Sequence, residues 1–217
     1  HSVYTCAPSL LEACGELADQ FNSLYVVHLS ETDSEVQTCR ERYGVTPVEH
    51  LQSLGLLNER VLAAHCVKLS PADIDTLAEH DVKISHCVES NMKLASGTAP
   101  VPDLLKRGVT VSIGTDGPAS NNDVDMFAEM SSVAKVHKVV SMDPTVMDAE
   151  STLYCGTMGG AAALNAADRI GSLELGKKAD LIVLNLDQPH LVPLYSIPSH
   201  LISVFQRTAW NHMASSS

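Results

Sequence analysis

The residues best suited to chemistry are a histidine and a glutamate three positions apart, in the run His28-Leu29-Ser30-Glu31. Neutral imidazole is a preferred ligand of zinc and iron. A carboxylate just beyond such a ligand can take a proton from a water molecule that the ion activates and pass it to a leaving group. The alternative interpretation is a polar strand end with a solvated glutamate. The run therefore fits either a metal-assisted hydrolytic site or a surface turn.

Three other positions could add to such a site. Asp116, in Gly114-Thr115-Asp116-Gly117, could bind a metal ion and orient the attacking water, although this composition also suits an Asx turn. His65, in Ala64-His65-Cys66, could polarise a substrate group or add a ligand, and the alternative is a hydrogen-bonded core histidine. His86 also precedes a cysteine and is a weaker candidate. Each residue taken alone allows a purely structural role.

Each of these positions follows a short run of strand-forming residues. The runs cover residues 24–27, 61–64, 82–85 and 109–113. Helix signals separate them: Ser70-Pro71-Ala72-Asp73 resembles a capping box, Gly108 closes 103–107, and apolar residues recur at helical spacing over 123–140. Three histidines and an aspartate at equivalent ends of consecutive strands favour a functional site over chance.

The alternation of strands and helices predicts the α/β class with a parallel sheet. Both a doubly wound sheet and a TIM barrel fit the spacing. In a barrel the carboxyl ends of the strands converge on one mouth, whereas an open sheet would spread them apart. We therefore expect a TIM (β/α)8 barrel, of which this chain supplies about half.

Composition excludes several classes of protein. The chain has 217 residues, 45% of them hydrophobic, and a formal net charge of −12 at pH 7. This charge argues against a general nucleic-acid or anionic-membrane binder, because both need a positive surface. No apolar run approaches the roughly 20 residues of a membrane helix, and we expect no signal peptide. The six cysteines form no C-x-x-C pair, which predicts free thiols in the cytoplasm.

In combination, these motifs resemble the amidohydrolase superfamily. The resemblance runs from His1 to about His200 and is closest to the branch of 5-methylthioadenosine/S-adenosylhomocysteine deaminases and triazine chlorohydrolases. The segments that carry it are His1-Ser2-Val3-Tyr4-Thr5-Cys6, His28-Leu29-Ser30-Glu31-Thr32, Ala64-His65-Cys66, Ser90-Asn91-Met92-Lys93-Leu94-Ala95-Ser96-Gly97, Gly114-Thr115-Asp116-Gly117, Ala119-Ser120-Asn121-Asn122-Asp123-Val124-Asp125-Met126-Phe127 and 171–181. The first of them matches the end of the family's fourth barrel strand.

The resemblance implies a role for each residue. His28 and Asp116 would be metal ligands, and Asp116 would also activate the water. Glu31 would shuttle the proton and touch the substrate ring, His65 would hydrogen-bond the water or the developing tetrahedral centre, and His1 would contact substrate. Substrate binding would thus involve His1, Glu31 and Asp116. The family implies one divalent ion, zinc or alternatively iron, and a barrel with a small β-sandwich built from both chain ends.

The chain also departs from the family pattern, and this sets the expected domains. The family's first strand supplies an H-x-H pair of ligands, and no H-x-H occurs here. We therefore interpret residues 1–170 as the C-terminal half of the barrel, 171–206 as part of the sandwich with a strand at 181–186, and 207–217 as a disordered or foreign tail. Residues 171–177 also match a G-x-x-x-x-G-K phosphate loop, but the strand follows this motif where a phosphate loop requires it to precede.

Two functional hypotheses of different classes follow. The first is a metal-dependent hydrolase that deaminates 5-methylthioadenosine or S-adenosylhomocysteine, with a triazine hydrolase or a guanine or cytosine deaminase as alternatives. The second is a non-catalytic fragment or interaction module that lacks the H-x-H ligands. A half-barrel would expose apolar helix faces, with Val124, Phe127, Met130 and Val133 on one helix and residues 161–164 on another. We therefore expect the chain to form homo-oligomers or to associate with an N-terminal half, and to be inactive alone.

Overall fold

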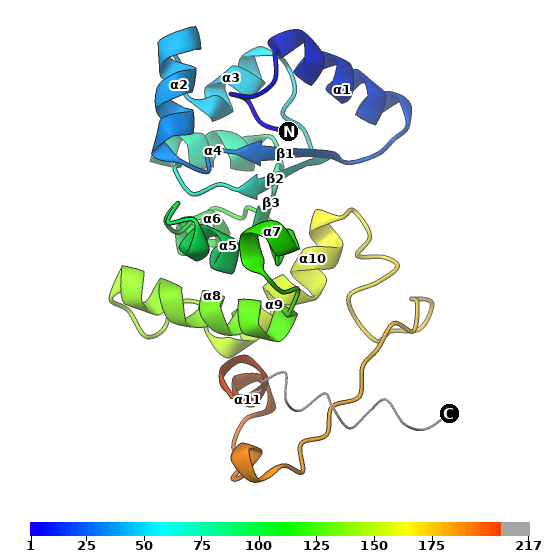
Figure 1. The fold of residues 1–217 in the computed structure, drawn as a ribbon. Helices are drawn as coiled ribbons and strands as arrows, with labels where there is room; N and C mark the ends of the chain where they lie inside the picture. The colour runs from blue at the N-terminus through cyan, green and yellow to red at the C-terminus, as the bar shows by residue number, and fades with distance from the viewer. Residues whose placement is uncertain (205–217) are drawn as a thin grey trace.

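The computed structural model describes residues 1–204, so the predicted tail at 207–217 lies outside the described residues. Helices and strands alternate through most of this length (Figure 1). The strands are β1 (Tyr25–Leu29), β2 (Val61–His65), β3 (Lys83–His86) and β4 (Val111–Ile113). The helices are α1 (Pro8–Gln20), α2 (Asp33–Tyr43), α3 (Pro47–Ser53), α4 (Pro71–Glu79), α5 (Val88–Lys93), α6 (Val101–Lys106), α7 (Pro118–Asn121), α8 (Met126–Ser141), α9 (Ala149–Gly156), α10 (Met158–Ala163) and α11 (Ile197–Ser203), with a 3-10 turn η1 at Pro189–Leu191.

The four strands form one parallel sheet in the order β1-β2-β3-β4. All four predicted strands are present, within a few residues of the predicted bounds. The sequential order is that of a barrel, because a doubly wound sheet reverses its strand order at a switch point. The described residues therefore form four βα units of a TIM barrel, and the prediction of an α/β half-barrel is confirmed.

Local sequence signals account for the helix ends. Ser70 caps α4 in a reciprocal capping box, in which its hydroxyl accepts from the Asp73 amide and the Asp73 carboxylate accepts from the Ser70 amide. Gly108 follows α6 with a φ of +79°, a conformation that glycine adopts at little cost. Asp125 caps α8 by accepting from the amides of Phe127 and Ala128. These caps fix where each helix leaves the sheet.

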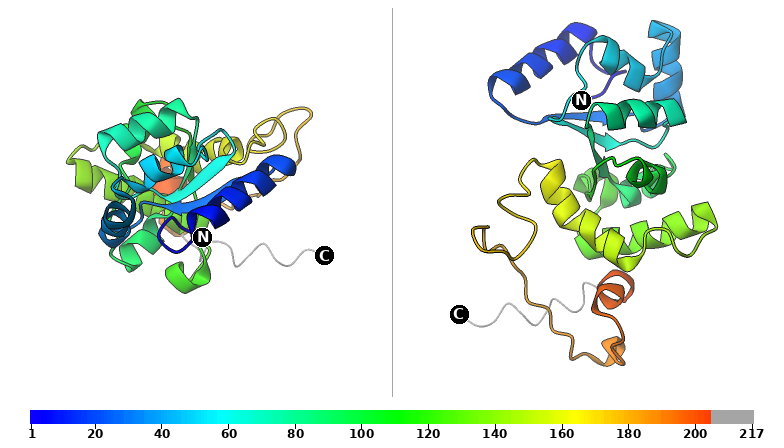
Figure 2. Two further views of the ribbon diagram at one scale, coloured as in Figure 1. Left: turned by 90° about the horizontal axis from the view of Figure 1, so that it is seen from above. Right: turned by 180° about the vertical axis from the view of Figure 1, so that it is seen from behind.

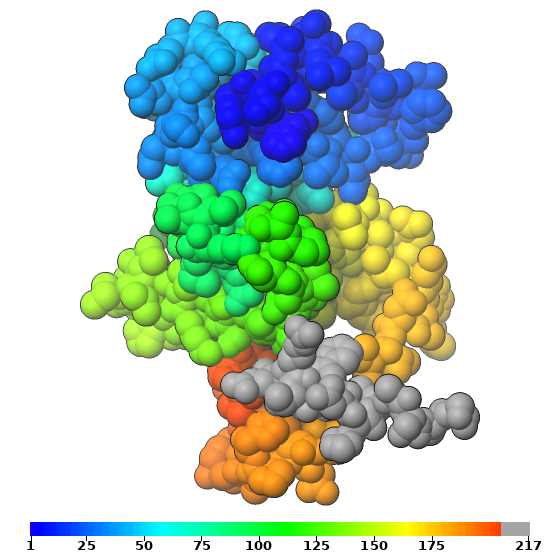
Figure 3. Space-filling view, in the orientation of Figure 1, coloured from blue at the N-terminus to red at the C-terminus, as the bar shows by residue number. Residues whose placement is uncertain are grey.

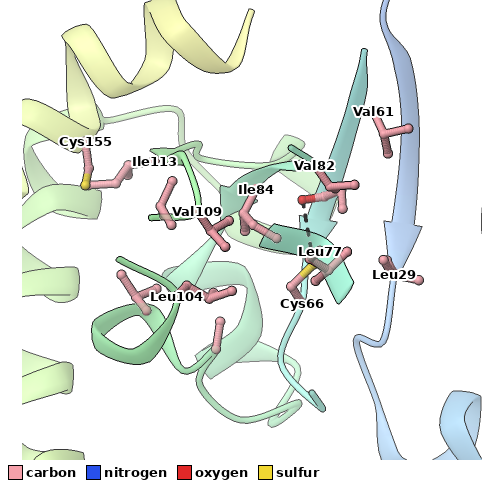
Figure 4. Packing of buried hydrophobic residues seen from close by; sticks show 14 of the residues in the cluster. Leu29, Val61, Cys66, Leu77, Val82, Ile84, Leu104, Val109, Ile113 and Cys155 are labelled. Atoms are coloured by element: carbon pink, nitrogen blue, oxygen red, sulfur yellow. Dashed lines mark hydrogen bonds between the residues drawn. The ribbon is translucent and has the colours of Figure 1, made fainter. Parts of the chain in front are cut away.

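The core lies between the sheet and the helices that flank it. Figure 4 shows Leu29 and Val61 from β1 and β2, Ile84 from β3 and Leu104 from α6 packed in one cluster. All four side chains are fully buried. The core continues along the sheet to β4 and α9, where Ile113 lies near Cys155 (Figure 4). Burial on both faces is typical of a parallel sheet and holds the strand ends in register.

The expectation of exposed apolar faces is wrong for Phe127, Met130 and Val133 on α8, whereas Val124 just before this helix is 66% exposed and Leu164 after α10 is 47% exposed. Phe127, Met130 and Val133 are 8%, 5% and 0% exposed, because α9 and α11 pack against this helix. The ribbon shows these helices together below the sheet (Figures 1 and 2). Apolar side chains are also exposed just after α1 and on β1 at the edge of the sheet, including Phe21 at 70% and Val26 at 58%.

The sandwich strand predicted at 181–186 is not present. Residues 171–188 have neither helix nor strand, and this segment loops away from the sheet (Figure 1). Leu181, Ile182 and Val183 are each more than half exposed. A strand needs a hydrogen-bonded neighbour, and none of residues 1–204 pairs with this segment. The space-filling view shows the chain after α10 running down one side of the molecule towards its lower end (Figure 3). In the described part of the chain, no helix is both long enough and apolar enough to cross a membrane.

Candidate active site

The carboxyl ends of the strands bring three histidine rings together. The His1 and His28 rings stack with centroids 4.5 Å apart, and the His28 and His65 rings lie 5.2 Å apart. This follows from the sheet register, in which Ser2 bridges to His28 and Leu29 pairs with His65. The predicted grouping of His1, His28 and His65 at one edge is therefore present.

The backbone turns sharply at three residues in and around this group of side chains. Ser30, His65 and Asp116 have φ values of +52°, +71° and +59°, in the left-handed region that residues other than glycine rarely adopt. Each lies at a strand end or in the loop that follows. The left-handed turn directs the chain out of the sheet and leaves the neighbouring side chains at the mouth of the half-barrel.

The hydrogen bond of His28 selects its tautomer. Its Nδ1 lies 3.0 Å from the carbonyl oxygen of His1, which can only accept, so Nδ1 carries the hydrogen. The lone pair is therefore on Nε2, as a metal ligand requires. Burial lowers the pKa of His28, the nearby His65 adds to this effect, and the carboxylates of Glu31 and Asp116 oppose it. The result is a neutral imidazole near neutral pH.

Asp116 is held by hydroxyl groups from two helices. Its Oδ2 accepts from Ser90 at 2.7 Å and from Ser120 at 2.6 Å. Burial raises the pKa of Asp116, but these hydrogen bonds and one from the Gly117 amide outweigh it and lower the pKa overall. The carboxylate is therefore ionised. It lies close enough to His28 to oppose the lowering of that ring's pKa, and the nearby His65 adds to the lowering of the pKa of Asp116.

Glu31 faces His65 across the mouth. Its Oε2 lies 4.0 Å from Nε2 of His65, and its Oε1 accepts from the Ser96 hydroxyl at 3.4 Å. The turn that presents it is fixed by the buried Glu35, whose carboxylate accepts from the amides of Ser30 at 3.0 Å and Glu31 at 2.7 Å. The Glu31 side chain is 18% exposed, so it is accessible to a substrate but is not a solvated surface group.

His65 has features of both interpretations that the sequence allows. It is only 2% exposed, and its Nδ1 bonds to Oδ1 of Asn91 at 2.9 Å, as expected of a core histidine. Its other nitrogen nevertheless faces Glu31. His65 is thus anchored on one side and available to the site on the other.

His86 belongs to the core rather than to the site. It is fully buried, and its Nε2 lies 3.1 Å from Nε2 of His137 on α8. Burial lowers the pKa of His86 to about 3 and that of His137 to about 4. Two neutral imidazoles can share one hydrogen, so this pair is a buried polar contact between β3 and α8. The sequence indicated that His86 is a weaker candidate for the site than His65, and its place in the core agrees with this.

The donor set fits part of a metal site. His28 supplies a neutral nitrogen and Asp116 an ionised oxygen, both suited to zinc or iron. Within residues 1–204, no group of three or more His, Cys, Asp or Glu side chains is arranged to hold an ion. The sequence contains no H-x-H pair, so the assignment of His28 and Asp116 as the metal ligands of this chain stays a prediction.

The sequence interpretation missed the residues that hold the site together. Ser90 and Asn91 lie in a motif that the resemblance used, but only the structure shows that they bond to Asp116 and His65. Glu35 had a visible signal, because Thr32-Asp33-Ser34-Glu35 has the spacing of a capping box. Its carboxylate bonds to the amides of Ser30 and Glu31, which precede the cap.

The chain resembles characterised proteins over most of its length. A 5-methylthioadenosine/S-adenosylhomocysteine deaminase of Syntrophobacter fumaroxidans is 51% identical over 202 residues, which are 93% of this chain and 46% of that protein. The structure of a zinc-bound adenosine deaminase from Xanthomonas campestris superposes with a TM-score of 0.91 at 44% identity, over 93% of this chain and 46% of that one. Atrazine chlorohydrolase from Arthrobacter aurescens, complexed with zinc, gives a TM-score of 0.85 at 28% identity, over 90% and 43%.

The chain spans about half the length of the curated relatives that it matches. The sequence model of the amidohydrolase family nevertheless matches residues 1–215, nearly the whole chain. The parallel half-barrel and the grouping of histidines and carboxylates at its mouth agree with this match. From its sequence and its fold, the chain is a member of the amidohydrolase family.

Proposed function

We propose that this chain forms the catalytic half of a metal-dependent hydrolase that deaminates an adenine nucleoside, with 5-methylthioadenosine or S-adenosylhomocysteine as substrate. The observation that carries the proposal is the convergence of His1, His28, Glu31, His65 and Asp116 at one end of the sheet. The high identity to proteins named as deaminases supports the choice of reaction.

In this proposal His28 and Asp116 would hold one divalent ion, zinc. Such an ion, when bound, supplies the Lewis acidity that makes water a nucleophile near neutral pH. The hydrogen bonds of Asp116 to Ser90 and Ser120 keep its carboxylate ionised and oriented. The bond from His28 to the His1 carbonyl keeps the lone pair on the other ring nitrogen.

Glu31 and His65 handle protons and charge. Water adds to the amino-bearing ring carbon, Glu31 accepts its proton and returns a proton to the amine, and ammonia leaves as the C–N bond breaks. His65 accepts a hydrogen bond from the entering water through Nε2, the nitrogen that faces Glu31. His1 lines the same mouth and contacts the substrate. We also propose a cytoplasmic location, because all six cysteines are free thiols.

Triazine hydrolysis is the second candidate, because the fold match to atrazine chlorohydrolase is close. We rank it below nucleoside deamination because its sequence identity is 28%, against 44% and 51% for the two deaminases. Both reactions replace a leaving group on a heteroaromatic carbon by oxygen. The identity of the leaving group therefore separates them.

A chimera provides the test. This chain replaces the matched 202-residue segment of the Syntrophobacter deaminase, which supplies the remaining half of that protein. We expect the zinc-loaded chimera to release ammonia from 5-methylthioadenosine and S-adenosylhomocysteine, and more slowly from adenosine. The intact relative is the positive control. Silence with all three nucleosides, while a chlorotriazine releases chloride, would reject the deaminase in favour of the second candidate.

A further inference from the structure

A second buried glutamate, Glu129 on α8, lies behind the site and joins two of its loops. Its side chain is 0% exposed. Oε1 accepts from the backbone amide of Glu89 at 3.1 Å, and Oε2 accepts from the side-chain amide of Asn121 at 3.2 Å. These two donors lie on different loops, one after β3 and the other after β4. The ribbon shows α5 and α7 side by side above α8, in agreement with their contacts (Figure 1).

The loop after β3 carries the supports of the site. Glu89 is followed by Ser90, whose hydroxyl bonds to Asp116, and by Asn91, whose carbonyl oxygen bonds to His65. A displacement of this short segment would therefore move the partners of both residues at once.

The loop after β4 carries Asp116 itself. Asn121 donates to the carbonyl of Thr115 at 2.7 Å, directly before Asp116, as well as to Glu129. Its neighbour Ser120 donates to the Asp116 carboxylate. Ser90 and Ser120 both donate to the Asp116 carboxylate, and Glu129 bonds to the residue next to each of them, Glu89 and Asn121.

We propose that Glu129 is a positioning residue for the proposed deaminase reaction: its carboxylate locks the loops after β3 and β4 to one another and so fixes Asp116 and His65. This inference rests on the proposed function. Glu129 touches neither substrate nor metal in this role, and it acts through Glu89 and Asn121.

The buried carboxylate of Glu129 indicates a hydrogen-bonding role, because an apolar side chain would be sufficient to fill the same space. None of the ion pairs within residues 1–204 includes Glu129. An ionised carboxylate without a cation is costly to bury, and an apolar side chain would fill the same volume without this cost. Burial, with a smaller contribution from Glu89, raises the pKa of Glu129 to about 7, against the hydrogen bonds that lower it. Each of the two loops offers one N–H donor, and a carboxylate supplies one acceptor oxygen to each of them.

The Glu129→Gln variant removes one connection with little change of shape. Glutamine has one acceptor oxygen, and its amide nitrogen would face an N–H donor at the other loop. In the full 217-residue chain we expect hydrogen exchange at 88–91 and 115–121 to accelerate at least about 10-fold, with β1 and β2 unchanged. Glu150→Gln is the matched control, because Glu150 on α9 is exposed and lies away from the site. Acceleration confined to α8, or equal across the chain, would reject the proposal.

A second arm measures catalysis in the zinc-loaded chimera. Glu129→Gln should lower kcat by about 10- to 100-fold, with KM changed less than about 3-fold, because misplaced catalytic groups affect the transition state more than binding. An unchanged kcat in an active chimera would overturn the inference.

An inactive unsubstituted chimera would count against the proposed function, while the hydrogen-exchange experiment still decides on Glu129. If Glu129→Gln does not fold, Asn121→Ala should loosen 115–121 but not 88–91, and any other pattern would refute the connection.

Discussion

Asn91 and His65 are joined by a hydrogen bond of 2.9 Å between the amide oxygen of one and Nδ1 of the other. An amide oxygen only accepts, so this bond keeps the hydrogen of the imidazole on Nδ1. Nε2 then carries a lone pair and faces Glu31 at 4.0 Å. Because Asn91 and His65 are both buried, the bond has little competition from water.

The tautomer of His65 should therefore depend on Asn91. In Asn91→Ala the Nδ1 hydrogen loses its acceptor, and we expect nitrogen chemical shifts of the His65 ring to move towards a mixture of the two neutral tautomers. His28 is an internal reference, because its Nδ1 bonds to the His1 carbonyl instead. NMR of the ¹⁵N-labelled chain measures both rings. An unchanged His65 spectrum would mean that another group fixes the tautomer.

Glu31→Gln should separate proton transfer from metal binding. The amide cannot accept and return a proton, so turnover of the chimera should fall by about 100-fold or more while its zinc content stays the same. Glu41→Gln is the control, since Glu41 on α2 is exposed and contacts Gln37. The measurements are steady-state ammonia release and metal analysis. Near-normal turnover would remove Glu31 from the proposed mechanism.

His28→Ala should instead affect the metal. Loss of one protein ligand should weaken zinc binding by the chimera at least about 10-fold, as judged by competition with a chelator. His80→Ala, at the C-terminal end of α4, is the control. The 217-residue chain without the other half should bind zinc weakly, because catalytic zinc sites usually have three protein ligands. Equal zinc affinity of the His28→Ala and unsubstituted chimeras would exclude His28 as a ligand.

Stability should fall in mild acid because of His86 and His137. Burial lowers the pKa of both, so the folded state keeps them neutral at a pH where the unfolded state protonates them. Above about pH 6.5 these histidines do not lower the free energy of unfolding. As the pH falls below this value, the free energy of unfolding decreases by about 1.4 kcal/mol per pH unit for each histidine, until the pKa of that histidine in the folded state is reached. Glu129, whose pKa is raised, acts in the opposite direction between about pH 7 and 4.5.

Urea unfolding at pH 8 and pH 5 measures this dependence. His137→Gln removes one of the two titrating groups, so the difference in unfolding free energy between the two pH values should shrink. His200→Gln, near the C-terminal end of the described chain, should leave it unchanged. An equal pH difference in His137→Gln and the unsubstituted chain would contradict the assignment.

The strands and the grouping of site residues were predictable for a simple reason. A parallel strand carries its own signal of composition and length, and the residue after it necessarily lies at the same edge of the sheet as its counterparts. His28, His65 and Asp116 were found in this way. The supports of the site carry no such signal. Asn91 and Ser90 act through contacts 26 residues away in sequence, and Glu129 joins its neighbour Asn121, 8 residues away, to Glu89, 40 residues away.

Two predictions failed where partners decide the structure. The run 181–186 has strand composition, but it has no neighbouring strand among residues 1–204 and remains irregular. The apolar face of α8 was expected to be exposed, but α9 and α11 cover it. Periodicity identifies a face that needs burial. It does not identify what covers the face.

The left-handed backbone at the strand ends has a consequence for heat resistance. Such conformations cost about 1–3 kcal/mol each for residues other than glycine. The proposed reaction uses His65 and Asp116, but it does not use Ser30. The Oγ of Ser30 has no hydrogen-bond partner among residues 1–204, and its amide would still bond to Glu35 in a variant. Ser30→Gly should release backbone strain and an unsatisfied hydroxyl together and raise Tm by about 2–4 °C. Ser30→Ala, which keeps the strain, should gain less, and a lower Tm for the glycine variant would contradict this account. We therefore expect the turn that presents Glu31 to be a place where the half-barrel can be made more heat-resistant without a change to any group that the proposed reaction uses.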